Sequence, residues 1–204
     1  REGHLPILRY IVERYGAPLR VEPNPAGLTP LQEVARLGCL VLTFDPAGRG
    51  KSWGEEDYGG PEHQDEVRMA LRYLSERPDV DAERIGIISI SLGVAMAVGA
   101  AASSEVPVSW LMDWEGPCDR EIITSGGTIR APASGPSMED DVYCHPREAV
   151  RHVGKLGCGY LRLQAERHHA QPEEKRHATR MMRAAAEGTL PGFQLNDHPR
   201  NEAP

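Results

Sequence analysis

The sequence predicts an α/β protein with a mostly parallel sheet and helices on both faces of that sheet. Short apolar runs, rich in β-branched residues, alternate along the chain with runs of helical periodicity. The apolar runs are continuous, as in strands that are buried on both faces. The length of 204 residues, with 40% hydrophobic and 26% charged residues, predicts one globular domain over residues 1–204.

The first predicted elements are a helix at residues 29–38 and a strand at residues 39–44. The helix begins with a capping box, TPLQ, that has proline at its first position, and Gly38 ends it. The strand, CLVLTF, stops at Asp45-Pro46, because the residue before a proline is restricted. A glycine-rich loop at residues 45–52 follows it.

The alternation of helix and strand continues to the end of the chain. A helix begins at Pro61, repeats apolar residues at helical spacing and ends before Pro78. The remaining predicted elements are a strand at 85–90, a helix from Leu92, strands at 108–112, 160–164 and 193–195, and a helix at 173–187.

One segment, residues 116–157, interrupts this rhythm. It is rich in Gly, Pro, Ser and acidic residues, and it holds only one plausible helix, near residues 146–156. A long irregular segment inside a compact domain is typically functional. We therefore expect an inserted lid at residues 116–157.

Charge and hydropathy exclude two classes of partner. The formal net charge of -7 leaves no basic surface of the size that nucleic-acid binding needs. The uncharged run at residues 85–104 has the length of a membrane span, but its serines and glycines and its division into a β-branched and an Ala-rich half indicate a buried strand and helix. We expect neither a nucleic-acid partner nor a membrane span.

The sequence says less about the cellular location of the protein and about the pairing of its cysteines. No signal segment is recognisable from Arg1 onwards, which favours a cytoplasmic location, whereas secretion would require a signal segment ahead of Arg1. The four cysteines show no C-x-x-C spacing, so a zinc ribbon or a thioredoxin motif is unsupported. The sequence leaves open whether Cys118 and Cys144 pair, and it does not determine the oligomeric state.

The most informative stretch is RIGIISISLG, residues 84–93, a buried strand that must turn sharply into a helix around Ser91. This context is typical of a nucleophile elbow, in which a strained turn exposes the serine oxygen and small residues flank it at two positions before and after. Gly93 is the second small residue, and Ser89 takes the place of the first glycine. Serine is also a common helix N-cap, but both flanks favour a nucleophile.

The chain here resembles the α/β-hydrolase fold superfamily, in particular its serine esterases and dienelactone-hydrolase-like members. LGCLVLTFDPAGRGKSWG is similar to the family's strand and D-x-x-G-x-G-x-S loop, and RPDVDAERIGIISISLG to its approach to the nucleophile. The two blocks span residues 37–93, and later elements follow the family's order. The resemblance implies the α/β-hydrolase fold and acyl hydrolysis, without fixing the substrate.

A competing motif lies in the same loop. Residues 45–52 (DPAGRGKS) differ from a phosphate-binding P-loop at the first position, Asp45 in place of glycine. A P-loop must lead into a helix whose N-terminus holds phosphate, but an acidic, turn-like segment follows here. The context therefore disfavours nucleotide binding.

The predicted general base is His198. In the resembled family the triad histidine follows the last strand, and His198 stands just after the strand at residues 193–195. The competing interpretation is an exposed loop histidine. His168, His169 and His177 lie in a charged stretch without ligand-like spacing, which favours a polar surface loop over a metal site.

The acid that would orient the histidine has more than one candidate. The family's usual acid position, after the penultimate strand, is occupied by His168. Glu166 would replace it from two residues earlier, or Asp113 would act from the end of the preceding strand, where Glu115 also lies. Asp113 is placed first because it ends an apolar run and would be partly buried. The third interpretation is an impaired site.

The expected oxyanion hole uses the backbone N–H of Leu92 together with one from residues 24–27. The sequence thus predicts a serine hydrolase that cleaves a carboxylic ester or a related acyl bond of a small molecule, with no cofactor and no metal. The alternative is a non-catalytic α/β-hydrolase-like protein that binds a ligand or a partner. Ser89 in the elbow and His168 in the acid position motivate this alternative.

Overall fold

The computed structural model describes residues 39–120, 137, 139–164 and 175–195. The chain divides into two compact units, residues 1–57 and 58–204, and each is described by itself. Every helix and strand of the described residues lies in the second unit. The predicted helix at residues 29–38 is outside the described residues, and the single domain over 1–204 stays a prediction.

Residues 39–44 of the first unit differ from the prediction, because they form no strand. Their backbone groups make no hydrogen bond with the described residues that follow. An apolar run favours burial, but a strand also needs a neighbour that accepts its ladder of hydrogen bonds. The glycine-rich loop behind this run is formed as predicted, with turns at residues 47–51.

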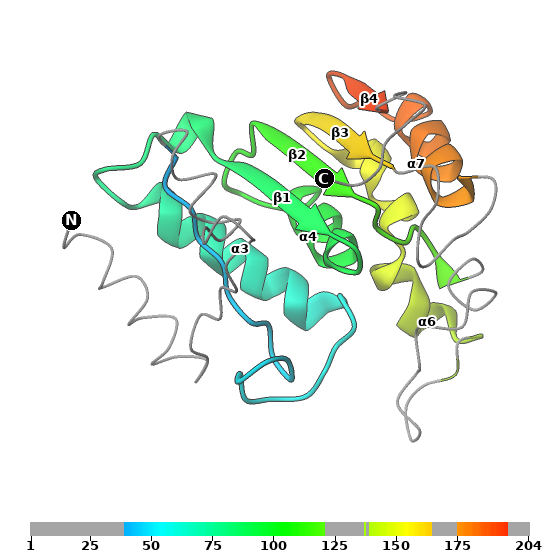
Figure 1. The fold of residues 1–204 in the computed structure, drawn as a ribbon, viewed down its shortest axis with the longest axis horizontal. Coiled ribbons are helices and arrows are strands. Elements are labelled where there is room, and N and C mark those ends of the chain that lie inside the picture. Colours follow the sequence, from blue (N-terminus) through cyan, green and yellow to red (C-terminus); the bar gives the residue numbers. More distant parts are fainter. Residues whose placement is uncertain (1–38, 121–136, 138, 165–174, 196–204) are drawn as a thin grey trace, which may run out of the picture. The chain divides into compact units, whose positions relative to one another are not determined.

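A parallel sheet of four strands forms the centre of the second unit (Figure 1). In spatial order, which is also chain order, the strands are β1 (Gly86–Ile90), β2 (Trp110–Trp114), β3 (Gly159–Leu163) and β4 (Phe193–Leu195). The predicted strands are thereby confirmed, β2 beginning two residues later than predicted. All four carboxyl ends meet at one edge of the sheet, because the strands are parallel.

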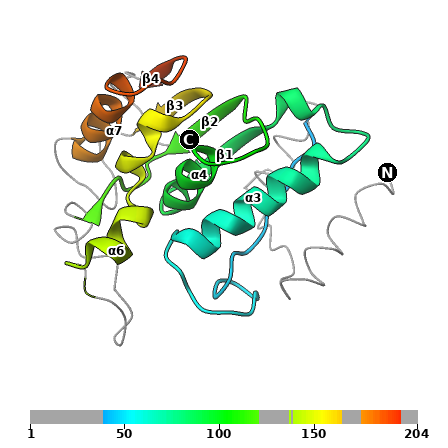
Figure 2. The ribbon, with the colours of Figure 1, turned by 180° about the vertical axis from the view of Figure 1, so that it is seen from behind.

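The longer predicted helices of this unit are also confirmed. They are α3 (Pro61–Ser75), α4 (Gly93–Ala101) and α7 (Arg176–Ala186), and a short helix, α6 (Asp141–Cys144), is added. Proline stands at the first turn of α3, where its missing N–H has no helical partner to lose. Figure 2 shows α3 and α4 in front of the strands, so the two helices lie on the same side of the sheet.

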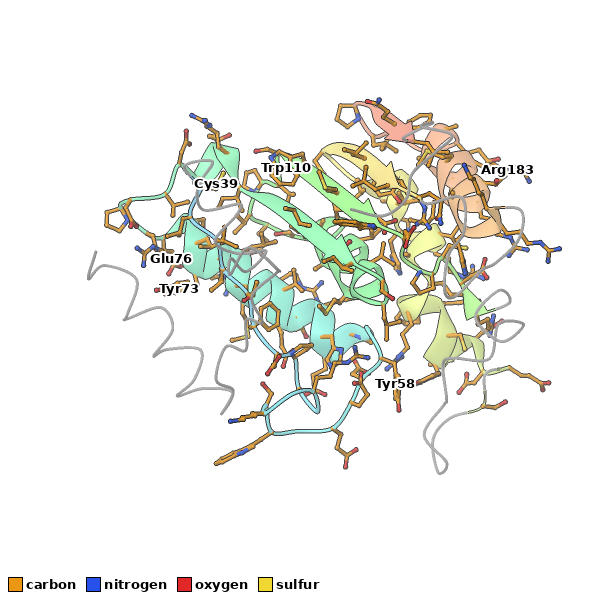
Figure 3. The ribbon with its side chains drawn as sticks, viewed as in Figure 1. Cys39, Tyr58, Tyr73, Glu76, Trp110 and Arg183 are labelled. Atoms are coloured by element: carbon orange, nitrogen blue, oxygen red, sulfur yellow. The ribbon has the colours of Figure 1, made fainter. Side chains whose placement is uncertain are left out.

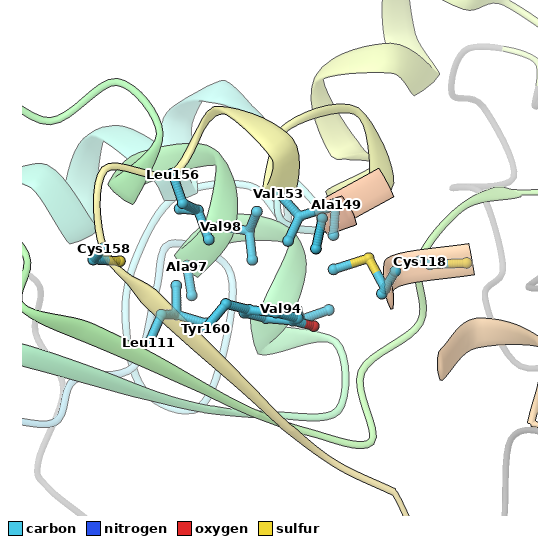
Figure 4. Close-up of a cluster of buried hydrophobic side chains, with 12 residues drawn as sticks. Val94, Ala97, Val98, Leu111, Cys118, Ala149, Val153, Leu156, Cys158 and Tyr160 are labelled. Carbon is cyan, nitrogen blue, oxygen red and sulfur yellow. The ribbon is translucent and has the colours of Figure 1, made fainter. Parts of the chain in front are cut away.

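The core lies between α4, the sheet and the segment that follows α6. Figure 4 shows Val94 and Val98 of α4 between the strand residues Leu111 and Tyr160 and the side chains of Val153 and its neighbours. These side chains are at most 2% exposed. Burial of closely packed apolar side chains contributes most of the favourable free energy of folding.

The described part of the predicted lid contributes to this core. Instead of one helix, residues 145–155 form three short 3-10 turns, His145–Arg147, Ala149–Arg151 and Val153–Lys155. Extended backbone at Glu148 interrupts them, with φ -90° and ψ 99°. Ala149, Val153 and Leu156 are fully buried. The lid at 116–157 stays a prediction, but Ala149, Val153 and Leu156 within it belong to the core.

The opposite face of the sheet carries apolar side chains with large exposed fractions. On β1, Ile88 and Ile90 are 45% and 60% exposed, while Ser89 between them is buried. Trp110, labelled in Figure 3 at the amino-terminal end of β2, is 42% exposed, and its ring lies over Gly86 of β1. None of the helices in the described ranges has the length and apolar character that a bilayer crossing requires.

Candidate active site

Ser91 occupies a strained turn between β1 and α4. Its φ of +51° is in the left-handed region, which a residue other than glycine enters at a cost of about 1–3 kcal/mol. Two backbone bonds hold it there: the Ser91 N–H donates to the Trp114 carbonyl at 2.9 Å, and the Val94 N–H donates to the Ser91 carbonyl at 3.1 Å. The backbone therefore makes the strained strand-to-helix turn that was expected of a nucleophile elbow.

The serine in place of the first elbow glycine fits the turn without strain. Ser89 is 5% exposed, and its hydroxyl donates to the Met112 carbonyl at 3.3 Å. A Cβ built on Gly93 would lie 3.8 Å from the Ser89 Cβ, an ordinary van der Waals contact. Ser89 therefore fits beside position 93 without a close contact.

Leu92 follows Ser91 as the N-cap residue of α4. The first N–H groups of a helix have no intrahelical acceptor, and the helix dipole makes this end electropositive. In the described ranges, the Leu92 N–H makes no backbone hydrogen bond. It remains able to donate to an anionic oxygen beside Ser91.

A second strained residue, Glu115, lies beside the elbow. Glu115 has φ +55°, and its N–H donates to the Leu163 carbonyl at 2.9 Å. Because Ile90 pairs with Trp114 in the sheet register, the next residues of the two strands, Ser91 and Glu115, are neighbours at the carboxyl edge. The Glu-Gly-Pro turn signal at residues 115–117 was visible in the sequence, but the strained conformation of Glu115 was not predicted.

Asp113, the first predicted orienting acid, lies on the face of the sheet that α4 covers and is fully buried. Its Oδ2 accepts a hydrogen bond from the Tyr160 hydroxyl at 2.6 Å and one from Arg162 Nη1 at 2.5 Å. Its Oδ1 accepts the Gly116 N–H at 3.0 Å. The structure thus joins Asp113 to a buried arginine.

Arg162 of β3 is the partner that the sequence analysis missed. Its Nη2 donates to the Gly116 carbonyl at 2.8 Å and to Gln164 Oε1 at 2.7 Å. Burial lowers the pKa of this guanidinium, but Asp113 and Tyr160 outweigh burial, so its pKa is raised above the ordinary value. Burial, and then Asp113, raises the pKa of the Tyr160 hydroxyl well above its ordinary value. Arg162 stays charged and Tyr160 protonated. A charged residue inside an apolar strand was the available signal.

Comparison with known proteins identifies the fold. No family model matches the chain. The acetyl xylan esterase 1 of a Thermoanaerobacterium species superposes with a TM-score of 0.60 and 11% identity, over 86% of this chain and 65% of that one. A Pyrococcus furiosus esterase superposes with a TM-score of 0.59 and 16% identity, over 81% of this chain and 63% of that one. The chain has the α/β-hydrolase fold.

Two further similarities concern longer proteins. A puromycin-hydrolyzing peptidase of Mycobacterium tuberculosis has a TM-score of 0.54 and 20% identity, over 68% of this chain and 22% of that one. An uncharacterized protein of Pseudomonas aeruginosa is 34% identical over 73 residues, which are 35% of this chain. The match spans only 20% of the length of that curated relative.

Two predicted members of an α/β-hydrolase triad, His198 and Glu166, lie outside the described residues, as do residues 24–27 of the oxyanion hole. In the described ranges, Ser91 has no hydrogen bond with an imidazole of His63, His145, His152 or His177. The structure therefore brings together Ser91, Leu92 and the strand end that carries Asp113. The triad itself stays a prediction.

His177 corrects one expectation, because it is buried and not part of a surface loop. It is 2% exposed, and its Nδ1 accepts the Cys118 N–H at 3.0 Å. The reason is helical periodicity: Met181 and Ala185 of α7 follow at intervals of four residues on the same buried face. His168 and His169 are outside the described residues. Within the described part of the chain, no three His, Cys, Asp or Glu residues form a metal-binding group.

Cys118 does not offer a second nucleophile. Burial raises the pKa of the Cys118 thiol far above its ordinary value, which keeps the thiol protonated. The four cysteines, all of which lie in the described ranges, form no disulfide. The possible pair of Cys118 and Cys144 is therefore two thiols in this structure.

In the loop at residues 45–52, the side chain of Asp45 lies against the backbone of the same loop. Asp45 Oδ2 accepts the Lys51 N–H at 3.3 Å, and a Cβ built on Gly50 would lie 2.0 Å from the same oxygen. The Ser52 hydroxyl donates to the Asp45 carbonyl at 2.6 Å. A carboxylate therefore lies against the backbone N–H groups that a P-loop would offer to phosphate, and no helix follows within residues 53–57. This geometry disfavours nucleotide binding.

Proposed function

We propose that the protein is a serine hydrolase that cleaves a carboxylic ester or a related acyl bond, with Ser91 as the nucleophile. The observation that carries the proposal is the left-handed backbone of Ser91, between the end of β1 and the N-terminus of α4. An ordinary N-cap serine has extended backbone and needs no such strain. Strain held in place at a strand end is a feature of functional sites.

The proposed reaction begins with attack of Ser91 Oγ on the acyl carbonyl carbon, while His198 accepts the hydroxyl proton. The tetrahedral oxyanion accepts a hydrogen bond from the Leu92 N–H at the electropositive end of α4. Collapse breaks the bond to the leaving group, which receives the proton from His198. Water then repeats the sequence on the acyl-enzyme and releases the carboxylic acid.

The proteins that share the fold support an acyl substrate. Two are named as esterases and one as a peptidase, so all three release an acyl group, from oxygen or from nitrogen. We propose a small ester first, because ester cleavage makes the smaller demand on protonation of the leaving group. The chemistry needs no cofactor and no metal. Asp113 and Glu166 are the two candidates for the acid that orients His198.

The test is labelling with a fluorophosphonate probe together with hydrolysis of short p-nitrophenyl esters. The expected result is one labelled serine, steady ester turnover, and loss of both in Ser91→Ala. Ser89→Ala is the matched control, because it also removes a serine hydroxyl. Ser89 is buried and lies two residues before Ser91. This control should label and turn over like the wild type.

Two outcomes would overturn the proposal. Wild-type protein that is folded but neither labels nor turns over an ester would favour the non-catalytic ligand-binding or partner-binding protein. Equal labelling of Ser91→Ala and the wild type would place the nucleophile elsewhere. Turnover of aryl amides but not of esters would keep the nucleophile and change the substrate class.

A further inference from the structure

We propose that Asp113 and Arg162 form a positioning pair that holds the backbone turn beside Ser91. The inference rests on the proposed function, since it assigns these two residues to the support of the same site. It gives Asp113 a role different from orienting the imidazole, and it makes Arg162 a functional residue although the guanidinium lies inside the protein.

The Asp113 carboxylate already accepts hydrogen bonds from other donors. It is fully buried and accepts hydrogen bonds from Tyr160, Arg162 and the Gly116 N–H. Oδ2, with two lone pairs, already has two donors. An imidazole would have to compete for Oδ1 or replace the arginine, and removing a buried countercharge is strongly unfavourable.

Asp113 and Arg162 together bond both backbone groups of Gly116. The Gly116 N–H donates to Asp113, and the Gly116 carbonyl accepts from Arg162 Nη2. The same Nη2 also donates to Gln164 Oε1, one residue after the end of β3. The planar guanidinium therefore links the turn after β2 to the end of β3 in a fixed geometry.

The turn at Gly116 also contacts the helix that begins after the proposed nucleophile. A Cβ built on Gly116 would lie 2.2 Å from Val94 Cγ1 and 2.8 Å from Asp113 Oδ1, so the turn lies directly against the first turn of α4. Val94 is the residue whose N–H donates to the Ser91 carbonyl. Movement of Gly116 would therefore displace the residue that closes the elbow.

Glu115 lies between Gly116 and the end of β2. Its left-handed backbone is unfavourable for any residue other than glycine, and such strain persists only where the surroundings impose it. The carbonyl of Trp114, just before it, accepts the Ser91 N–H. Fixing Gly116 thus also fixes the strand end that supports the nucleophile.

A buried ion pair is by itself weak support for stability, since apolar residues of similar volume often do as well. What the pair supplies here is direction, because it bonds named backbone atoms that an apolar pair could not bond. This difference makes the proposal testable. Stability and positioning respond differently when both charges are removed together.

The experiment compares Arg162→Met, Asp113→Leu and the double variant in the full chain. Each single variant leaves a buried charge or its donors without a partner, and we expect a large loss of thermal stability. The double variant should recover most of that stability. Its labelling rate with a fluorophosphonate and its kcat for a p-nitrophenyl ester should nevertheless stay at least tenfold below wild type, with KM little changed.

Arg162→Lys keeps the charge and serves if the double variant fails to fold. A single ammonium cannot hold Asp113 and the Gly116 carbonyl in the geometry of a guanidinium, so kcat should fall here as well. The matched control removes another ion pair of the same unit, by Arg77→Gln with Asp79→Asn. That control should label at the wild-type rate.

Three results separate the possible failures. Wild-type protein that does not label overturns the proposed function and this inference with it. The positioning role alone is overturned if the wild type labels and a folded variant labels equally fast. The variant here is either the double variant or Arg162→Lys. Loss of activity in Asp113→Asn with a shifted pH midpoint of kcat/KM, while Arg162→Lys stays active, would assign the orienting acid to Asp113 and overturn the positioning pair.

Discussion

Ser91 and Glu115 are two residues of neighbouring strands that hold the same strained backbone at the same edge of the sheet. In each, the N–H donates to the last carbonyl of the next strand, and the chain then turns out of the sheet. Repetition of this device on adjacent strands places two side chains side by side at the carboxyl ends. This is the edge at which open α/β sheets bind their ligands.

The first prediction at the residue scale concerns Gly116. Gly116→Ala places a methyl group against Val94 and the Asp113 carboxylate, neither of which has free space. We expect a loss of about 1–3 kcal/mol in the free energy of unfolding, measured by urea denaturation. Ester turnover should fall together with stability, because the turn supports the elbow.

Gly157→Ala is the control for this substitution, since a Cβ built there meets no atom of the described residues within 4 Å. It should be close to neutral in both measurements. If Gly116→Ala were as stable and active as the wild type, the close contact between the turn and α4 would not exist in solution.

The second prediction at the residue scale concerns His152 and pH. Burial lowers the pKa of His152, and nearby Lys155 and Arg151 lower it further, against the opposing effect of two backbone hydrogen bonds. In the unfolded chain a histidine takes up a proton below about pH 6.5, whereas the folded protein resists it. The stabilising effect of this neutral histidine is therefore complete above that pH and is lost as the pH falls below it.

The measurement compares thermal unfolding of the wild type and His152→Gln at about pH 7.5 and at about pH 5.5, on either side of the ordinary histidine pKa. The wild type should lose more stability than the variant on acidification, because glutamine takes up no proton. Parallel losses in the two proteins would show that His152 titrates alike in the folded and unfolded states.

At the residue scale, the turn at Ser91 could be predicted because it depends on local order along the chain, a strand, a small residue, a serine and a helix. The role of Ser91 as nucleophile stays a prediction. The sequence was insufficient for Asp113, whose neighbours are decided by register between strands. Asp113 faces Arg162 only because the two residues pair across β2 and β3. A carboxylate at the end of an apolar run is equally compatible with a catalytic acid and with a buried counter-ion, until its partner is known.

At the element scale, α3 packs on α4, and Gln64 and Gly99 lie at the contact. Gln64 is 6% exposed, and its Nε2 donates to the Gly59 carbonyl at 3.1 Å and to the Pro146 carbonyl at 2.6 Å. Gly99 has no side chain, and a Cβ there would lie 2.4 Å from Gln64 Cδ. The glycine leaves room for a polar side chain that links three segments.

Gly99→Ala should therefore destabilise the protein, although alanine is intrinsically better than glycine in a helix by about 1 kcal/mol. The added methyl group would displace Gln64 and leave the buried Gly59 carbonyl and the half-buried Pro146 carbonyl without their donor. The measurement is a double-mutant cycle of unfolding free energies with Gln64→Ala.

The loss in the double variant should be clearly smaller than the sum of the single losses, because both substitutions break the same bonds. Gly93→Ala is the control, since its Cβ would meet only an ordinary contact with Ser89 among the described residues. Additive losses at residues 64 and 99 would refute the shared role.

The elements were predictable where periodicity and end signals agreed, as for α3, with proline at its start, and for the strands of the sheet. Two predictions at this scale failed for different physical reasons. Residues 39–44 have the composition of a strand, but composition cannot supply a hydrogen-bonded neighbour. Residues 145–155 have helical spacing in part, but extended backbone at Glu148 divides them into separate turns.

At the scale of the whole molecule, the alternation of elements predicted a mostly parallel sheet covered by helices, and the resemblance of residues 37–93 implied the α/β-hydrolase fold. Structures of low sequence identity confirm that fold. The fold places Ser91 at the carboxyl edge, but it does not identify the substrate, because many activities share this fold. The chemistry must therefore be argued from the site, where the strained serine, the helix N-terminus and the buried pair come together.

The most direct measurement is the site and stoichiometry of covalent labelling by a fluorophosphonate, determined by intact mass and by mapping of the modified peptide. The account predicts one adduct per chain at Ser91, its rate rising as a base near neutral pH loses its proton. Modification of folded, active protein at a serine other than Ser91, or ester turnover that continues unchanged in Ser91→Ala, would contradict it.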